Sequence, residues 1–175
     1  AAAGADLVIE AVPERIELKL EVFEALDELA PKHAILGSNT SSLSITEMAA
    51  ATNRAPQVVG LHFFNPVHRM KLLEIVRALE TSDATIAACE AVGERIGKEC
   101  VTVRESPGFV TSRINAMIGN EAFYMLQEGV ASAADIDKAP ASNRKVPQMV
   151  RSCRSFHLKP NRPGANRIAR PICSL

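Results

Sequence analysis

The feature that most constrains the fold is a regular alternation of short apolar runs with segments of helical periodicity between residues 6 and 105. The run DLVIEAV at 6–12 is typical of a strand covered on both faces. Pro13 follows it and suits the start of a helix. This alternation predicts an α/β fold, a parallel sheet covered by helices. Strands are expected at 6–12, 33–38, 57–63, 71–79 and 100–105, and helices at 14–30, 45–52 and 82–99.

The character of the sequence changes at Ser106-Pro107-Gly108. A long helical pattern occupies 109–129 and ends at Gly129, a residue favoured just beyond a helix. Ser132 is expected to cap a second, short helix. The sequence therefore predicts a sheet domain at 1–105 and the start of an all-α domain at 106–139.

Residues 140–175 follow neither periodicity. They contain five prolines and many basic residues but no acid, a composition that does not specify a packed core. We interpret this segment as an irregular tail, as after a shift of reading frame. The alternative is a basic tail that binds nucleic acid, although its arginines alternate with prolines and do not cluster on one face.

Composition excludes several classes of function. The formal net charge is +0, which argues against nucleic acid or an anionic membrane as partner. No apolar run approaches the ~20 residues of a membrane span, and the first residues do not form a signal peptide. Scattered cysteines predict reduced thiols in the cytoplasm, and no Cys or His spacing predicts a metal site. The four cysteines are Cys89, Cys100, Cys153 and Cys173.

Two titratable residues interrupt neighbouring apolar runs. His62 ends VVGLHFFNP, and Glu74 lies inside KLLEIV. On adjacent strands, the carboxylate could fix the tautomer of the imidazole and raise its basicity, which makes a general base with an orienting partner. Ligands of open α/β sheets also collect at the carboxyl ends of strands, where His62 lies. The alternative is a core histidine bonded to a carbonyl and a carboxylate at a solvated edge.

Polar residues gather in the turn SNTSS, after the second expected strand. Ser44 and Glu47 form a capping box for the next helix, so Ser41 is left to donate its hydroxyl to a substrate oxygen. Helix entry is the other explanation for Ser41. Asn39 and Asn65 suit turns, because asparagine tolerates turn conformations.

Four blocks of the sequence resemble, in order, successive blocks of the 3-hydroxyacyl-CoA dehydrogenases. The blocks are DLVIEAVPE, SNTSSL, GLHFFNPV with KLLEIV behind it, and SPGFVTSRI, and GLHFFNP is the most specific. The resemblance runs from about residue 5 to about residue 139. It implies a Rossmann-type NAD-binding domain, followed by an all-α domain that carries the contact of a homodimer.

The resemblance also implies roles for single residues. His62 would take the proton of the 3-hydroxyl of an acyl-CoA substrate while a hydride passes to NAD, with Glu74 as its partner. Ser41 would hydrogen-bond the substrate oxygen. Glu14 and Lys19 match positions that line the NAD site. Asn65 lies where the family's loop approaches both nicotinamide and substrate, and Asn39 and Asn65 are further candidates for cofactor contacts.

Two departures from the family pattern stand out. Ser112 occupies a substrate-site position where many members have asparagine. The sequence also contains no G-x-G-x-x-G loop, which a dinucleotide pyrophosphate requires. We therefore expect an internal fragment: a partial Rossmann-type sheet whose first βαβ unit is missing, and too little of the enzyme for turnover.

Two rival functions remain open at this stage. One is a dehydrogenase of the same architecture that acts on a hydroxy acid without CoA, against which the SNTSSL and HFFNP blocks argue. The other is a helical dimerisation module without turnover, because 109–129 carries an apolar face. That face comprises Ile114, Met117, Ile118, Phe123, Met125 and Leu126. Acyl-chain length, reaction direction and NAD against NADP are not determined.

Overall fold

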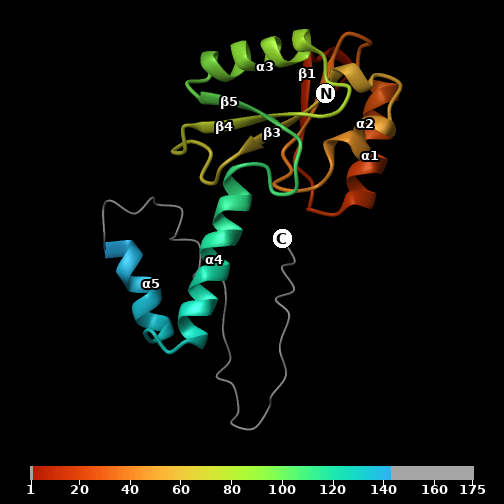
Figure 1. Ribbon diagram of the computed structural model, residues 1–175. Helices are drawn as coiled ribbons and strands as arrows, with labels where there is room; N and C mark the ends of the chain where they lie inside the picture. Colours follow the sequence, from red (N-terminus) through yellow and green to blue (C-terminus); the bar gives the residue numbers. More distant parts are fainter. Residues whose placement is uncertain (1, 143–175) are drawn as a thin grey trace. The chain divides into compact units, whose positions relative to one another are not determined.

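The computed structural model describes residues 2–142, and every structural statement below concerns that part of the chain. Contacts divide the chain into two compact units, residues 1–112 and 113–175. The first unit contains a five-stranded sheet with its helices (Figure 1). In chain order the elements are η1 (Ala2–Gly4), β1 (Leu7–Glu10), α1 (Ile16–Leu29), β2 (Ile35–Ser38), α2 (Ile45–Ala50), η2 (Ala55–Gln57), β3 (Val58–Phe63), β4 (Leu72–Arg77), α3 (Asp83–Arg95), β5 (Glu99–Arg104), α4 (Thr111–Gln127) and α5 (Ala133–Ser142).

The strands lie in the order β1-β2-β3-β4-β5, which confirms the predicted α/β class and the Rossmann-type sheet. Three of the four pairings are parallel, but β3 and β4 are antiparallel. A parallel pairing needs a crossover of a dozen or more residues, and the segment 64–71 between β3 and β4 is too short for one. The strand–helix alternation did not indicate this reversal.

Alternate residues of the central strands divide the core between the two faces of the sheet. Helices α1 and α2 cover the face that includes Leu36, Val58 and Val76. Helix α3 covers the opposite face through Ile86 and Cys89. Side chains alternate between the two faces along a strand, so residue 62 lies on the same face as Val58 and residue 74 on the same face as Val76. This is the face that α1 and α2 cover.

The predicted helix caps are confirmed. Ser44 Oγ accepts the backbone N–H of Glu47 at 3.1 Å, and Ser132 Oγ accepts that of Asp135 at 3.2 Å. At the end of α4, Gly129 has φ +71° and the N–H of Val130 bonds to the carbonyl of Met125 at 3.0 Å. This is the Schellman geometry that favours glycine.

Three sequence expectations need correction. Arg15 caps α1, so Pro13 is not its first residue and Glu14 lies outside the helix, free to contact other segments. Strand β1 is an edge strand with Ile9 41% exposed, so it is not covered on both faces. Helix α5 continues to Ser142, past the expected boundary at 139. The rest of the predicted irregular tail, 143–175, lies outside the described residues.

The sequence also led to expectations about membrane spans, metal sites and cysteines. Within the described residues, no helix is long and apolar enough to cross a membrane. Over the same part of the chain, no group of three or more His, Cys, Asp or Glu side chains is arranged to hold a metal ion. Cys89 and Cys100 are free thiols, and burial raises the pKa of Cys89 to about 12.

Candidate active site

The predicted pair of His62 and Glu74 is formed in the structure. The two residues are direct partners across the antiparallel pairing of β3 and β4. His62 Nδ1 lies 2.7 Å from Glu74 Oε2, and both side chains are buried. Cross-strand partners on one face are close enough for such contacts, so the antiparallel reversal itself creates the pair.

Glu74 stays ionised at neutral pH despite its burial. Burial alone would raise its pKa, but hydrogen bonds from His62 and from Thr111 outweigh that effect and hold the pKa below its ordinary value. The carboxylate is therefore ionised at any pH above the ordinary carboxyl pKa, and its ionic contact with His62 is lost only in acid. A permanent negative charge is thus held beside the imidazole.

This arrangement leaves one nitrogen of His62 available for chemistry. An ionised carboxylate only accepts hydrogen bonds, so Nδ1 carries a proton, and in the neutral form of the ring the lone pair lies on Nε2. The ring packs against Phe64 at a centroid distance of 4.4 Å and meets the Phe109 ring edge-on at 5.8 Å. His62 can therefore accept a proton at Nε2, as a general base requires.

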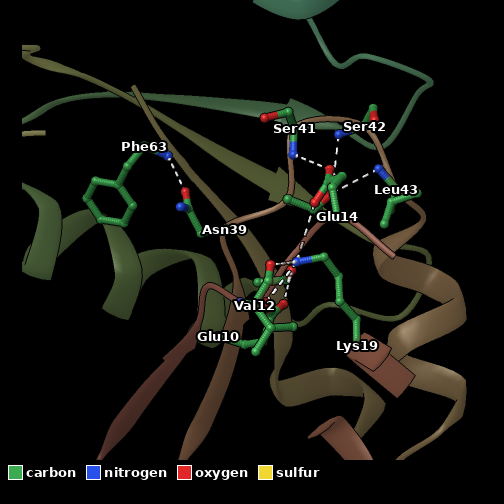
Figure 2. A network of polar contacts seen from close by, with 11 residues as sticks. Glu10, Val12, Glu14, Lys19, Asn39, Ser41, Ser42, Leu43 and Phe63 are labelled. Atoms are coloured by element: carbon green, nitrogen blue, oxygen red, sulfur yellow. Dashed lines mark hydrogen bonds and ion pairs between the residues drawn. The ribbon is translucent and has the colours of Figure 1, made fainter. Parts of the chain in front are cut away.

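A second polar cluster ties the turn after β2 to the start of α1 (Figure 2). Glu14 Oε1 accepts the Thr40 hydroxyl and, at 2.9 Å, the backbone N–H of Ser41. Thr40 Oγ1 in turn accepts the N–H of Leu43 at 2.9 Å. Figure 2 shows the Ser41 hydroxyl directed away from Glu14, so this network does not occupy it.

Asn39 links this turn to the strand that carries His62. Its side-chain oxygen accepts the backbone N–H of Phe63 at 2.9 Å (Figure 2). Because Phe63 follows His62 directly, the bond fixes the turn with Ser41 to the carboxyl end of β3. The structure thus assigns Asn39 a positioning contact, and a cofactor contact stays a prediction.

Lys19 is fully buried and bonded to several acceptors. Its ammonium lies 2.8 Å from Glu10 Oε1, 3.2 Å from the Val12 carbonyl and 3.4 Å from Glu14 Oε2. Glu10 Oε2 also accepts the Ser38 hydroxyl at 2.7 Å, which joins the ends of β1 and β2. Since three acceptors surround the ammonium, Lys19 orients Glu10 and Glu14 in this state.

Two predicted site residues are not among the contacts described above. Asn65 is exposed in the segment after β3, and Ser112 is half-buried in the first turn of α4. Sequence reasoning missed Glu10, Thr40 and Thr111. Glu10 gave a usable signal, because it is an acid inside an apolar run, as Glu74 is.

Comparison with known families identifies the family of this chain. Residues 1–106 match the family model described as 3-hydroxyacyl-CoA dehydrogenase, NAD binding domain, which covers more than half of the chain. The chain belongs to the 3-hydroxyacyl-CoA dehydrogenase family. Residues 108–149 match the model of this family's C-terminal domain, past the limit near residue 139 expected from the sequence blocks.

Similar proteins carry related names. The chain is 50% identical over 134 residues to "Probable 3-hydroxybutyryl-CoA dehydrogenase" of Bacillus subtilis (strain 168), covering 77% of this chain and 47% of that protein. The solved structure of (S)-3-hydroxybutyryl-CoA dehydrogenase PaaH1 from Ralstonia eutropha matches with a TM-score of 0.74 and 48% identity, over 78% of this chain and 48% of that one. The chain spans about half the length of the curated relatives that it matches.

One similar structure carries the name of a different substrate. It is 5-formyl-3-hydroxy-2-methylpyridine 4-carboxylic acid 5-dehydrogenase, described as an NAD+ dependent dismutase. It matches with a TM-score of 0.78 and 34% identity, over 81% of this chain and 46% of that chain. The fold is therefore shared by enzymes with different substrates, and the substrate has to be tested directly.

Proposed function

We propose that this chain supplies the catalytic half-site of an NAD-dependent 3-hydroxyacyl-CoA dehydrogenase, which interconverts 3-hydroxyacyl-CoA and 3-ketoacyl-CoA. The observation that carries the proposal is the buried His62–Glu74 pair, with Nε2 of His62 left to accept a proton, in a chain of this family. The names of the 3-hydroxybutyryl-CoA dehydrogenases among its relatives support an acyl-CoA substrate.

In this mechanism His62 acts as the base. Its Nε2 takes the proton of the 3-hydroxyl, and the electrons of the O–H bond form the carbonyl as a hydride leaves carbon 3. NAD, when bound, supplies the hydride acceptor. Glu74 stabilises the imidazolium that results, and the Ser41 hydroxyl donates a hydrogen bond to the substrate oxygen. In the reverse direction His62 returns the proton.

The residues present fit one side of the NAD site. Glu14 is partly exposed beside the Ser41 turn, and Asn65 is exposed beyond the end of β3, so both can meet the nucleotide. Lys19 would act through Glu14 because its own donors are used. The pyrophosphate would need a glycine-rich loop, and these 175 residues contain no G-x-G-x-x-G.

We further propose that the helical part forms a homodimer contact. Along α4, Ile114 is 46% exposed and Met117 is 66% exposed, which leaves an apolar surface in the described part of the chain. A cytoplasmic location is proposed with it, from the scattered cysteines of the sequence.

A chimera tests the proposed function. The 134 residues that match the Bacillus subtilis relative replace the corresponding segment of that protein, which supplies the remaining half. We expect the chimera to oxidise NADH with acetoacetyl-CoA but not with free acetoacetate. The 175-residue chain alone should show neither turnover nor a saturable change in NADH fluorescence, because positioning of the nicotinamide supplies roughly 7–11 kcal/mol of the barrier. A folded chimera that binds NADH but uses only the acid without CoA would support the rival dehydrogenase.

Ser112→Asn in the chimera tests the assignment of this position to the substrate site. We expect folding and kcat to be retained and KM for acetoacetyl-CoA to fall by up to about fivefold, on the scale of one neutral hydrogen bond, about 1 kcal/mol. The measurement is steady-state kinetics against both substrates. Loss of folding or activity would mean that the position is packed for serine and does not contact substrate.

A further inference from the structure

The Glu74 carboxylate has a second partner besides His62. Oε2 is used by His62, whereas Oε1 accepts two hydrogen bonds from Thr111, one from its backbone N–H and one from its hydroxyl, each 2.9 Å long. Both oxygens are therefore held, and rotation of the carboxylate about its terminal bond would break contacts at both ends. Charge-assisted hydrogen bonds of this kind are roughly twice as strong as neutral ones.

The segment that ends at Thr111 contacts both members of the pair. Gly108 has φ +72° and Phe109 has φ +49°, a left-handed backbone that a residue other than glycine seldom adopts. The bend buries the Phe109 ring, 4% exposed, in the core and against the edge of His62. Two residues later it brings Thr111, the first residue of α4, to Glu74.

The geometry points to Thr111 as a positioning residue of the catalytic pair: its hydroxyl orients the Glu74 carboxylate, and Glu74 orients His62. This inference rests on the proposed function. The backbone N–H at this position could come from almost any residue, so the specific contribution of Thr111 is its side chain. A carboxylate at the first turn of a helix is also favoured by the helix dipole.

Thr111→Val tests the inference, since valine keeps the shape and the backbone donor but lacks the hydroxyl. In the chimera we expect kcat to fall about tenfold, on the scale of one lost hydrogen bond to a charged group. KM for NADH and for acetoacetyl-CoA should stay within about twofold. Thr111→Ser should restore most of the rate. Thr102→Val, on the exposed surface of β5, is the matched control and should leave the rate unchanged.

A second measurement does not depend on activity. In the 175-residue chain, ¹⁵N-labelled histidine should give a deshielded Nδ1–H resonance from His62, identified by its absence in His62→Gln. We expect this resonance in the parent chain and in Thr111→Ser, and its broadening or loss in Thr111→Val. An unchanged resonance together with an unchanged kcat in Thr111→Val overturns the inference and leaves the proposed function standing. If the chimera has no dehydrogenase activity, the proposed function fails and the resonance alone decides whether Thr111 positions the pair.

Discussion

His62→Ala in the chimera is expected to lower kcat for acetoacetyl-CoA reduction by about 10²–10⁴-fold, the usual contribution of general acid–base catalysis. The reason is that His62 is the histidine whose ring Glu74 holds, and no other histidine in the described part of the chain is held by Glu74 for this proton transfer. NADH binding, measured by fluorescence titration, should change little. The chain offers a matched control in His33→Ala, because His33 also contacts a carboxylate, Asp6 at 2.8 Å, but on the exposed surface.

Glu74→Gln should also reduce kcat strongly while KM for NADH stays nearly constant. An amide has one oxygen and one NH₂ group, whereas Glu74 accepts hydrogen bonds at both ends, from His62 and from Thr111. If the amide nitrogen faces Thr111, it opposes the backbone N–H of Thr111; if it faces His62, it donates to Nδ1 and moves the imidazole proton to Nε2, which removes the base. A Glu74→Gln chimera within about threefold of the parent rate would remove Glu74 from the mechanism.

Arg54→Met is expected to cost about 3–5 kcal/mol of unfolding free energy, the range for removing one partner of a buried ion pair. Arg54 Nε lies 2.7 Å from Asp27 Oδ1, and its other nitrogens donate to the carbonyls of Asp27, Ala30 and Pro31. The pair is buried and joins the end of α1 to the segment before β3. Urea unfolding of the chimera, followed by circular dichroism, measures the loss.

The loss should also depend on pH in a defined direction. Burial raises the pKa of Asp27, but hydrogen bonds from Asn53 and Arg54 and the charge of Arg54 outweigh it and lower the pKa from 3.8 to about 2. A lowered folded-state pKa adds stability above the unfolded value, and this stability disappears as the pH falls from about 4 to about 2. The shift corresponds to about 2 kcal/mol.

An exposed ion pair provides the control for Arg54. Arg77 Nη2 lies 2.7 Å from Asp83 Oδ1, but the Asp83 side chain is almost fully exposed. Arg77→Met should therefore cost less than about 1 kcal/mol. Equal losses in the two variants would show that the Arg54 pair contributes no more than a surface contact does.

Local patterns in the sequence were sufficient for the presence and type of the main strands and helices and for some of their ends, but not for the start of α1 or the end of α5. Period-2 and period-3.6 patterns depend only on neighbouring residues, and so do caps such as Ser44 and the glycine at 129. The same reasoning singled out His62 and Glu74, because a titratable group inside an apolar run is costly unless it is paired. The roles given to Asn65 and Ser112 came from the family resemblance and stay predictions.

The tertiary structure alone decided how these groups are combined. The antiparallel turn between β3 and β4 sets the register that places Glu74 opposite His62, and a shift of one residue would put the two on opposite faces. Likewise, Lys19 looks like a surface residue of an amphipathic helix, yet folding buries it against Glu10 at the end of another strand. Thr111 reaches Glu74 only because the chain bends at Gly108 and Phe109. Such contacts depend on strand register and chain direction over 9 to 37 residues of separation, which no local periodicity encodes.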